Sequence, residues 1–383
     1  MTVDRRASDR PHVLIAGAGL AGVETVIALR ASGAAVDITV LAPGPRFVEY
    51  DACAAAPFNP PAARGTSLRQ LTTDFDAAWH PGLLRRVDTA ERTVVTRAGE
   101  SLAYDWLVLA VGAETEPDYS GALVYSDWRD APNYRLLMRK AEQHRVHSIA
   151  FVRPVGYTWL TPLYSLALLT AAHLRKAGVA LKLVTPEDSP LGIFGASSAD
   201  RVRGLLRSHG VSLYLGAYTG PGPAGEVGIQ PGHRRTAADR VVRAPRLIRR
   251  PIAGLPCTAD SFLVTDTYSR VRGVDRVLAA GDATSFPVKD ASIAVQQADV
   301  AAAYIANRTG ARVATPMFRP HLHADLMTPS GSVELHADLS GCNGDTRADL
   351  TTPQPATGAD RALPDRGQRF RRSPRPAADL LNR

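Results

Sequence analysis

The chain has 383 residues, of which 45% are hydrophobic and 21% are charged, and its formal net charge at pH 7 is +8. This balance is typical of a globular protein with a hydrophobic core, and the length suits two or three domains. Many of the arginines lie in two stretches that contain at most one aromatic residue each, so we do not expect nucleic-acid binding.

No N-terminal segment combines a basic end, an apolar core and a cleavage site, which favours a cytoplasmic protein. The longest apolar stretch, WLTPLYSLALLTAAHL, is interrupted by polar residues and proline, and it is too short to span a bilayer. The basic excess leaves association with a membrane surface open, but no anchor supports it. The cysteines, Cys53, Cys257 and Cys342, form no CxxC pair, and we predict no local redox disulfide and no metal site.

The apolar run Val13–Ala16 predicts a strand that leads directly into Gly17, Gly19 and Gly22, the GxGxxG spacing. Gly17 permits a tight turn, Gly19 lets the backbone approach a pyrophosphate, and Gly22 allows the helix to pack closely on the strand. The helix that follows points its free N–H groups at the phosphates. This stretch therefore predicts a dinucleotide site rather than a purely structural turn.

The second predicted strand, VDITVL, is followed by Ala42, Pro43 and Gly44, where an acidic residue that binds a ribose hydroxyl is usual. Asp37 lies at the beginning of this strand, where we interpret it as a solvated charge. The N-terminal region alone therefore leaves the choice between NAD and FAD open.

Further strands are predicted at Leu84–Val87 and Thr93–Arg97, as a hairpin, and at Trp106–Gly112, as a buried strand. A polar crossing segment from roughly Glu114 to Val146 ends the first domain.

A second strand–helix–strand unit begins at HSIAFVRP and continues through the apolar helix Leu163–Ala177 and the strand ALKLVTPE. The alternation goes on with the helix SADRVRGLLRSHG and the strand VSLYLGAY, which predicts a parallel sheet. The turn after the first strand has only Gly156, followed by Tyr157 and Trp159, whose side chains obstruct the approach of a pyrophosphate. We therefore do not expect a nicotinamide nucleotide to bind here in the standard pose.

From Phe262 the chain produces a strand, a Gly281–Asp282 turn and a long alanine-rich helix that begins near Ala291. Beyond residue 335 the sequence is rich in Pro, Gly, Asp and Arg and has little apolar periodicity. This composition predicts a disordered tail over residues 335–383.

Three separated motifs resemble those of one flavoprotein family. After the glycine turn, YDWLVLAVGAETEP resembles the hydrophobic-ATG-xx-P signature of two-dinucleotide-domain flavoproteins, with Val111 where threonine is usual. VDRVLAAGDATSFP is similar to the strand and Gly-Asp pair of the same proteins. Together they resemble the pyridine nucleotide-disulfide oxidoreductase superfamily over roughly residues 11–310. The details, including VTPEDSPLGIFG, look closest to its sulfide:quinone reductase and type II NADH dehydrogenase branch.

The resemblance implies an α/β fold of two nested, three-layer Rossmann-like domains with an irregular C-terminal tail. The FAD-binding domain is expected in two parts, residues 11–115 and 249–310. A second dinucleotide-binding-like domain, residues 145–248, is inserted between them.

The resemblance also implies noncovalent FAD. Asp282 is expected to accept a hydrogen bond from a ribitol hydroxyl, and the helix near Ala291 to aim its N-terminus at the pyrimidine edge of the flavin. Lys289 adds a positive charge there or is merely solvated, and the alternative for Asp282 is a turn cap. Gln296 and Gln297 either reach the ring or lie on the helix surface. The residues expected to bind the cofactor are Gly17, Gly19, Leu20, Ala21, Gly22, Ala110, Gly112, Gly281, Asp282, Lys289 and Ser292.

The functional prediction is an FAD-dependent oxidoreductase that takes electrons from an unidentified small-molecule donor and passes them to a small-molecule acceptor. An NAD(P)H dehydrogenase with an atypical nucleotide site and a catalytically lapsed FAD-binding module are the alternatives. Sulfide:quinone reductases require cysteines near the flavin, and quinone-using members end in a membrane anchor; the sequence offers neither pattern. No catalytic residue and no oligomeric state is predicted.

Overall fold

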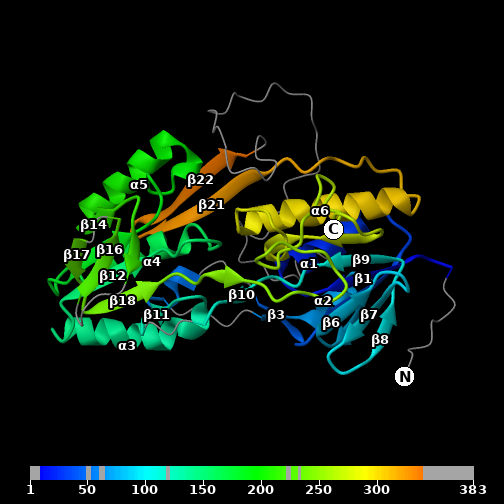
Figure 1. Ribbon diagram of the computed structural model, residues 1–383, viewed down its shortest axis with the longest axis horizontal. Coiled ribbons are helices and arrows are strands. Elements are labelled where there is room, and N and C mark those ends of the chain that lie inside the picture. Colours follow the sequence, from blue (N-terminus) through cyan, green and yellow to red (C-terminus); the bar gives the residue numbers. More distant parts are fainter. Residues whose placement is uncertain are drawn as a thin grey trace.

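The computed structural model describes residues 9–48, 53–59, 65–117, 121–220, 226–231 and 234–339. Two α/β units lie next to each other along the long axis of the molecule (Figure 1), and each is built around a five-stranded sheet. The expected α/β class with Rossmann-like sheets is therefore confirmed.

The sheet of the first unit has the strand order β20-β9-β1-β2-β5, and every pairing in it is parallel. Its strands are β1 (His12–Ala16), β2 (Asp37–Ala42), β5 (Ala78–Pro81), β9 (Trp106–Leu109) and β20 (Val277–Ala279). Along β1, Val13 and Ile15 belong to one core and Leu14 and Ala16 to another, on the opposite face. The strand is apolar at successive positions because both of its faces are covered.

Helices α1 (Leu20–Ala31) and α6 (Ala291–Arg308) pack against each other and share a core with one face of this sheet (Figure 1). The antiparallel meander β6-β7-β8 covers the opposite face through Val87, Val94 and Leu102. The meander consists of β6 (Leu84–Asp88), β7 (Thr93–Thr96) and β8 (Ser101–Ala103), and the smaller elements are β3 (Arg46–Val48), η1 (Cys53–Ala55), β4 (Gly65–Ser67) and α2 (Leu68–Asp74).

The second unit repeats this three-layer arrangement with the parallel strand order β11-β18-β12-β13-β14. Ile149 and Phe151 of β12 share a core with the helices, whereas Ala150 and Val152 pack against the meander β15-β16-β17. The strands are β11 (Leu123–Val124), β12 (Ser148–Val152), β13 (Ala180–Val184), β14 (Val211–Tyr214), β15 (Tyr218–Gly220), β16 (Glu226–Gln230), β17 (Arg234–Ala237) and β18 (Arg240–Arg243). The helices are η2 (Trp128–Asp130), α3 (Ala131–Glu142), α4 (Pro162–His173), η3 (Gly192–Phe194) and α5 (Ala196–Ser208).

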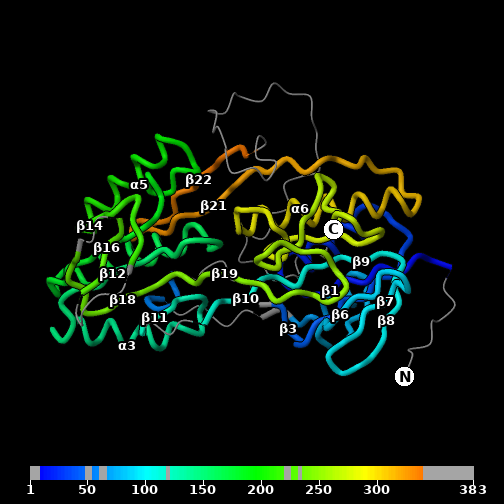
Figure 2. The backbone as a smooth tube through the Cα atoms, in the orientation of Figure 1, coloured from blue at the N-terminus to red at the C-terminus, as the bar shows by residue number. Residues whose placement is uncertain are grey.

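The chain passes from the first unit to the second at β10 (Glu114–Thr115) and returns at β19 (Leu247–Ile248). These two segments pair antiparallel, and Figure 2 shows them together at the middle of the molecule. We therefore propose that the domain boundaries lie near residues 115 and 248, where the sequence analysis put them.

A C-terminal hairpin, β21 (His321–Thr328) and β22 (Gly331–Asp338), corrects the predicted beginning of the tail. The expected disorder from residue 335 is wrong for the first residues of that segment, because Leu335 and Leu339 are each only 2% exposed in the core of the second unit. The alternation of buried and exposed positions along β22 is the signal that a purely compositional argument misses. The rest of the predicted tail lies outside the described residues.

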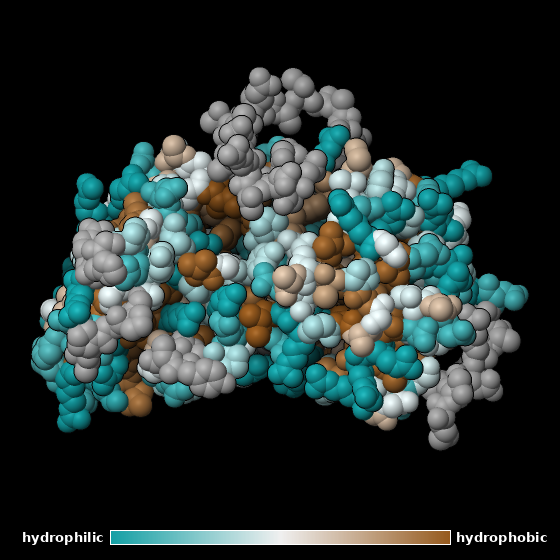
Figure 3. Space-filling model, in the orientation of Figure 1, coloured by the Kyte–Doolittle hydropathy of each residue, from teal (hydrophilic) through white to brown (hydrophobic). Residues whose placement is uncertain are grey.

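None of the helices in the described ranges is long and apolar enough to cross a membrane. On the face shown in Figure 3, the apolar side chains of the described residues lie in small groups separated by hydrophilic ones.

The buried face of β22 gives a direct test of the corrected boundary. Leu335→Ala should lower the free energy of unfolding by about 2–5 kcal/mol, because it leaves a cavity beneath the hairpin. Urea denaturation measures this loss, and Ser332→Ala, an exposed position of the same strand, is the matched control. Equal stability of the two variants would show that β22 does not pack on the core.

Candidate functional site

The glycine turn between β1 and α1 contains two glycines that the backbone packing requires. Gly17 has a φ of +109°, and a Cβ atom there would lie 2.2 Å from the carbonyl oxygen of Ala110 at the end of β9. A Cβ atom on Gly22 would lie 2.1 Å from the carbonyl oxygen of Gly17. These contacts bring strand, turn and helix together more closely than any other residue permits.

Gly19 differs, because no described atom lies within 4 Å of the position that its Cβ would take. It is the N-cap of α1, where no side chain caps the helix, and the first turn of α1 has no acidic residue. The first N–H groups of the helix, including those of Leu20 and Ala21, have no acceptor within the helix and lie at the positive end of its dipole. Uncapped donors beside an open glycine fit a pyrophosphate, so the residues present suit the dinucleotide that the sequence implies.

The second motif lies on the neighbouring strand. The chain leaves β9 through Ala110 and turns at Gly112, which has a φ of +67°. Arg249, just after the crossing strand β19, donates a hydrogen bond from Nη1 to the carbonyl oxygen of Gly112 at 2.8 Å. Its Nε has no hydrogen-bond partner among the described residues, and burial lowers the pKa of the guanidinium. Nothing in the local sequence distinguishes Arg249 from the other arginines, so this contact could not be predicted.

The third motif follows β20, on the other side of β9. Gly281 has a φ of +74° and donates its N–H to Oε1 of Gln297 at 2.8 Å, so this glutamine holds the turn from within α6. Asp282 is partly buried, and desolvation raises the pKa of its carboxyl group while the charge of Lys289 opposes the shift. Its Oδ2 accepts a hydrogen bond from the indole Nε1 of Trp159 at 3.1 Å.

Lys289 is not the solvated lysine that one interpretation allowed, because the residue is only 1% exposed. Its Nζ donates to the carbonyl oxygens of Asp282, at 3.3 Å, and of Thr284. The ammonium also lies 4.6 Å from the ring centroid of Tyr157 and 4.3 Å from that of Phe262. Burial lowers the pKa of Lys289 to about 8, although the carboxylate of Asp282 acts in the opposite direction.

The beginning of α6 is occupied by structural contacts. Asp290 caps the helix by accepting from the backbone N–H of Ser292 at 2.8 Å and from its hydroxyl at 2.6 Å. The Ser292 hydroxyl in turn accepts from the N–H of His323 in β21 at 3.1 Å. Gln296 also binds the hairpin, through both backbone groups of His321. Ser292, which was predicted to bind the cofactor, therefore joins α6 to β21 among the described residues.

The turn after β12 sends its aromatic side chains toward the first unit. The Tyr157 hydroxyl donates to the carbonyl oxygen of Ser285 at 3.3 Å, and the backbone of Trp159 forms an isolated parallel bridge with Lys289. Helix α4 then begins at Pro162, which has no backbone N–H to offer. The place where a second pyrophosphate would bind thus has bulky side chains, and the helix beside it has one backbone N–H donor fewer than a helix without proline at its start.

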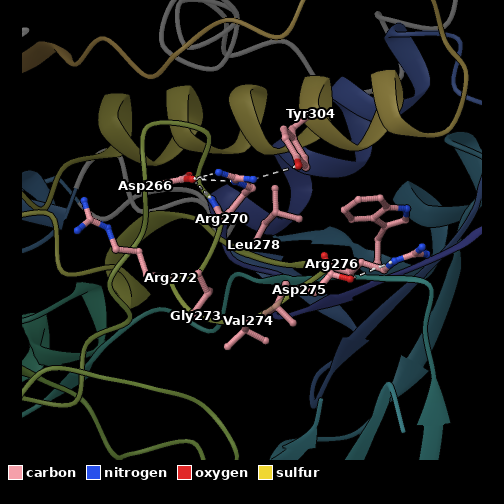
Figure 4. Close-up of a pocket in the computed structure, with 12 residues that line it drawn as sticks. Asp266, Arg270, Arg272, Gly273, Val274, Asp275, Arg276, Leu278 and Tyr304 are labelled. Carbon is pink, nitrogen blue, oxygen red and sulfur yellow. Dashed lines mark hydrogen bonds and ion pairs between the residues drawn. The ribbon is translucent and has the colours of Figure 1, made fainter. Parts of the chain in front are cut away.

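A cavity of about 450 Å³ lies elsewhere, near the amino ends of β9 and β20 (Figure 4). Arg270 reaches into this region, where it binds Asp266 at 2.6 Å and lies over the ring of Tyr304. No residue predicted to bind the cofactor lines this cavity. In open α/β sheets ligands bind at the carboxyl ends of the strands, so we place the candidate site at the opposite edge.

The lowered pKa of Lys289 predicts a pH dependence of stability. Between about pH 8 and 10.5 the unfolded chain keeps a proton that the folded chain has lost, so stability should rise with pH in this window. Relative to Lys289→Met, the flavin-free wild type should gain up to about 3 kcal/mol of unfolding free energy. Urea denaturation at a series of pH values measures the gain. The exposed Lys176→Met is the control, and parallel curves for wild type and Lys289→Met would contradict the prediction.

Comparisons with known proteins agree with this geometry. Residues 11–150 match the family model described as pyridine nucleotide-disulphide oxidoreductase. The ferredoxin reductase component of chlorobenzene dioxygenase from Cupriavidus sp. (strain PS12) is 27% identical over 359 residues, which cover 84% of this chain and 81% of that protein.

Two solved structures are similar in fold. The sulfide:quinone oxidoreductase of Aquifex aeolicus superposes with a TM-score of 0.75 at 18% identity, covering 86% of this chain and 84% of that one. The ferredoxin reductase for the CYP199A2 system of Rhodopseudomonas palustris gives a TM-score of 0.65 at 18% identity, with coverages of 87% and 83%. The glycine turn, the Gly-Asp turn, the match of residues 11–150 and the shared fold agree with one another: the chain is similar to pyridine nucleotide-disulfide oxidoreductases, which are FAD-dependent enzymes.

Proposed function

We propose that the chain holds FAD at the carboxyl ends of β1, β9 and β20 and accepts electrons from a donor other than a nicotinamide nucleotide in the standard pose. The observation that carries the proposal is the juxtaposition of three turns on adjacent parallel strands. They contribute the uncapped N-terminus of α1, the Gly112 turn and the partly buried carboxylate of Asp282. When bound, FAD supplies two-electron redox chemistry.

The groups around these three turns have distinct roles in the proposed site. The N–H groups after Gly19 bind the pyrophosphate, and Asp282 accepts a hydrogen bond from the ribitol chain. Lys289 and Arg249 place two positive charges near the negative charge that a reduced flavin carries, and the two groups are close enough for Arg249 to lower the pKa of Lys289. Tyr157 and Trp159 exclude water from this region because they pack against the Asp282 turn.

A second candidate concerns the acceptor. The Cupriavidus relative is named as a ferredoxin reductase component, and a complex of putidaredoxin reductase with putidaredoxin has a similar fold, with a TM-score of 0.63. These names favour a small electron-carrier protein as the acceptor, in place of a small molecule. Oxidation of the reduced protein by an added ferredoxin, compared with oxidation by a soluble quinone, distinguishes the two acceptors.

The glycine turn provides a matched pair of substitutions. Gly19→Ala should leave folding unchanged, because Gly19 has a φ of −74° and its Cβ meets open space. The new methyl group would occupy the path of the pyrophosphate, so FAD affinity should fall by roughly tenfold or more, at least about 1.4 kcal/mol. Gly22→Ala should instead lower stability by about 1–3 kcal/mol through its clash with the carbonyl oxygen of Gly17. Flavin titration of the apoprotein and urea denaturation measure the two effects. A Gly19→Ala variant that binds FAD like the wild type would disprove the phosphate assignment.

The crowded turn after β12 predicts poor reduction by nicotinamide nucleotides. In anaerobic stopped-flow experiments NADH and NADPH should bleach the flavin slowly, because Tyr157 and Trp159 disturb the binding and orientation of the donor. Dithionite should reduce the same sample fully, which separates a poor donor from a damaged cofactor. Fast bleaching by either nucleotide at micromolar concentration would favour the NAD(P)H dehydrogenase alternative. Purified protein without flavin absorbance would favour the lapsed module.

A further inference from the structure

The outward face of the hairpin β21–β22 carries a continuous set of metal-ligating side chains. Along β21 the residues at alternate positions, such as Leu322 and Leu326, are buried, so their neighbours point the other way. Three successive cross-strand pairs on this second face consist of histidine and carboxylate residues alone: His321 with Asp338, His323 with His336, and Asp325 with Glu334.

The middle of this face has the tightest geometry. The rings of His323 and His336 lie with their centroids 4.2 Å apart and tilted by 35°. Nε2 of His336 is 3.6 Å from Oε2 of Glu334, two residues earlier on the same strand. One ligand atom from each of His323, Glu334 and His336 can be chosen so that all lie within 4.8 Å of one another. Ligand atoms around a tetrahedral ion at bond lengths of about 2.0–2.2 Å lie about 3.3–3.6 Å apart, so side-chain rotations that bring the three atoms closer together complete the set.

We propose that His323, Glu334 and His336 bind one divalent transition-metal ion of the type of Zn²⁺. Two imidazoles and one carboxylate suit a borderline cation such as Zn²⁺, Co²⁺ or Ni²⁺, whereas Ca²⁺ and Mg²⁺ prefer sites made of oxygen ligands alone. Three protein ligands leave a fourth position for water. The exposed edge of the site, at Glu334 and His336, gives the ion a path of entry.

The position of the hairpin indicates what the ion would do. Strand β21 contacts both α6 of the first unit and α4 of the second. The N–H of His323 donates to Ser292 in α6, and the N–H of Met327 donates to Ser165 in α4 at 2.9 Å. Since the ligands come from both strands, an ion bound to them would stabilise the folded hairpin and with it the segment that connects the units. This role is independent of FAD and of the electron donor.

The test uses the full-length holoprotein after treatment with EDTA and removal of the chelator. Calorimetric titration with Zn²⁺ at pH 7.5 should show one ion bound per chain, and the same titration with Ca²⁺ should show none. Zn²⁺ should also raise the melting temperature. His336→Ala and Glu334→Gln replace exposed side chains, and each should lower Zn²⁺ affinity by roughly tenfold or more. His147→Ala, an exposed histidine in front of β12, is the matched control and should bind like the wild type.

The pH profile gives a second readout. Since imidazole must lose its proton to bind the ion, Zn²⁺ affinity should fall steeply between pH 7.5 and 5.5 in the wild type. Two results would overturn the proposal: Zn²⁺ binding that is unchanged in both His336→Ala and Glu334→Gln, or the absence of stoichiometric binding to a wild type whose flavin spectrum and melting curve are normal.

Discussion

The buried ammonium group of Lys289 is the interaction on which the arrangement of the two units depends. It is fixed by two backbone carbonyls of the turn that contains Asp282, and it faces the aromatic rings of Phe262 and, from the other unit, Tyr157. A charge with so little access to water persists only when dipoles, rings and a counter-charge replace its hydration. Asp282 supplies the counter-charge, and its own carboxylate is fixed by the indole of Trp159. The turn at Gly281–Asp282 and the turn after β12 therefore stabilise each other.

This mutual arrangement gives the turn after β12 a structural role in the contact between the two units. In a nucleotide site the turn after the first strand must leave its backbone bare. Here the same turn serves as a contact surface, since its aromatic residues contact the ammonium group of Lys289 and the carboxylate of Asp282. If the turn opened to bind a pyrophosphate, Lys289 would lose its contact with the ring of Tyr157. The turn therefore cannot bind a pyrophosphate and cover Lys289 at the same time.

Much of the fold could be predicted from the sequence because its signals are local. The turns at Gly17–Gly22 and at Gly281–Asp282 each follow a short apolar strand, and such patterns are read within a single window. Three features were beyond such reasoning. The contact of Arg249 with Gly112 joins residues more than a hundred positions apart. The burial of Lys289 depends on the contact between the two units, since Tyr157 comes from the second one.

The third feature is the histidine and carboxylate set of the hairpin, which emerges only from the register of β21 against β22. Along each strand its members are separated by single residues, and no metal motif results. The same region produced the error in the tail boundary. Leu335 is flanked by Glu334 and His336, so composition suggested a polar tail where alternation indicates a half-buried strand.

The insertion of the second unit between β9 and β20 has a consequence for synthesis. All five strands of the second sheet have been translated by Arg243, whereas the sheet around β1 still lacks β20, more than thirty residues later. Segments that are translated together fold together, so the second sheet can form while the first one keeps an open strand edge beside β9. The core of the second unit is completed last, because it includes Leu326 and Leu335 of the C-terminal hairpin. The chain is thus most exposed to aggregation in the middle of its translation, and β20 and α6 end that period by covering the edge.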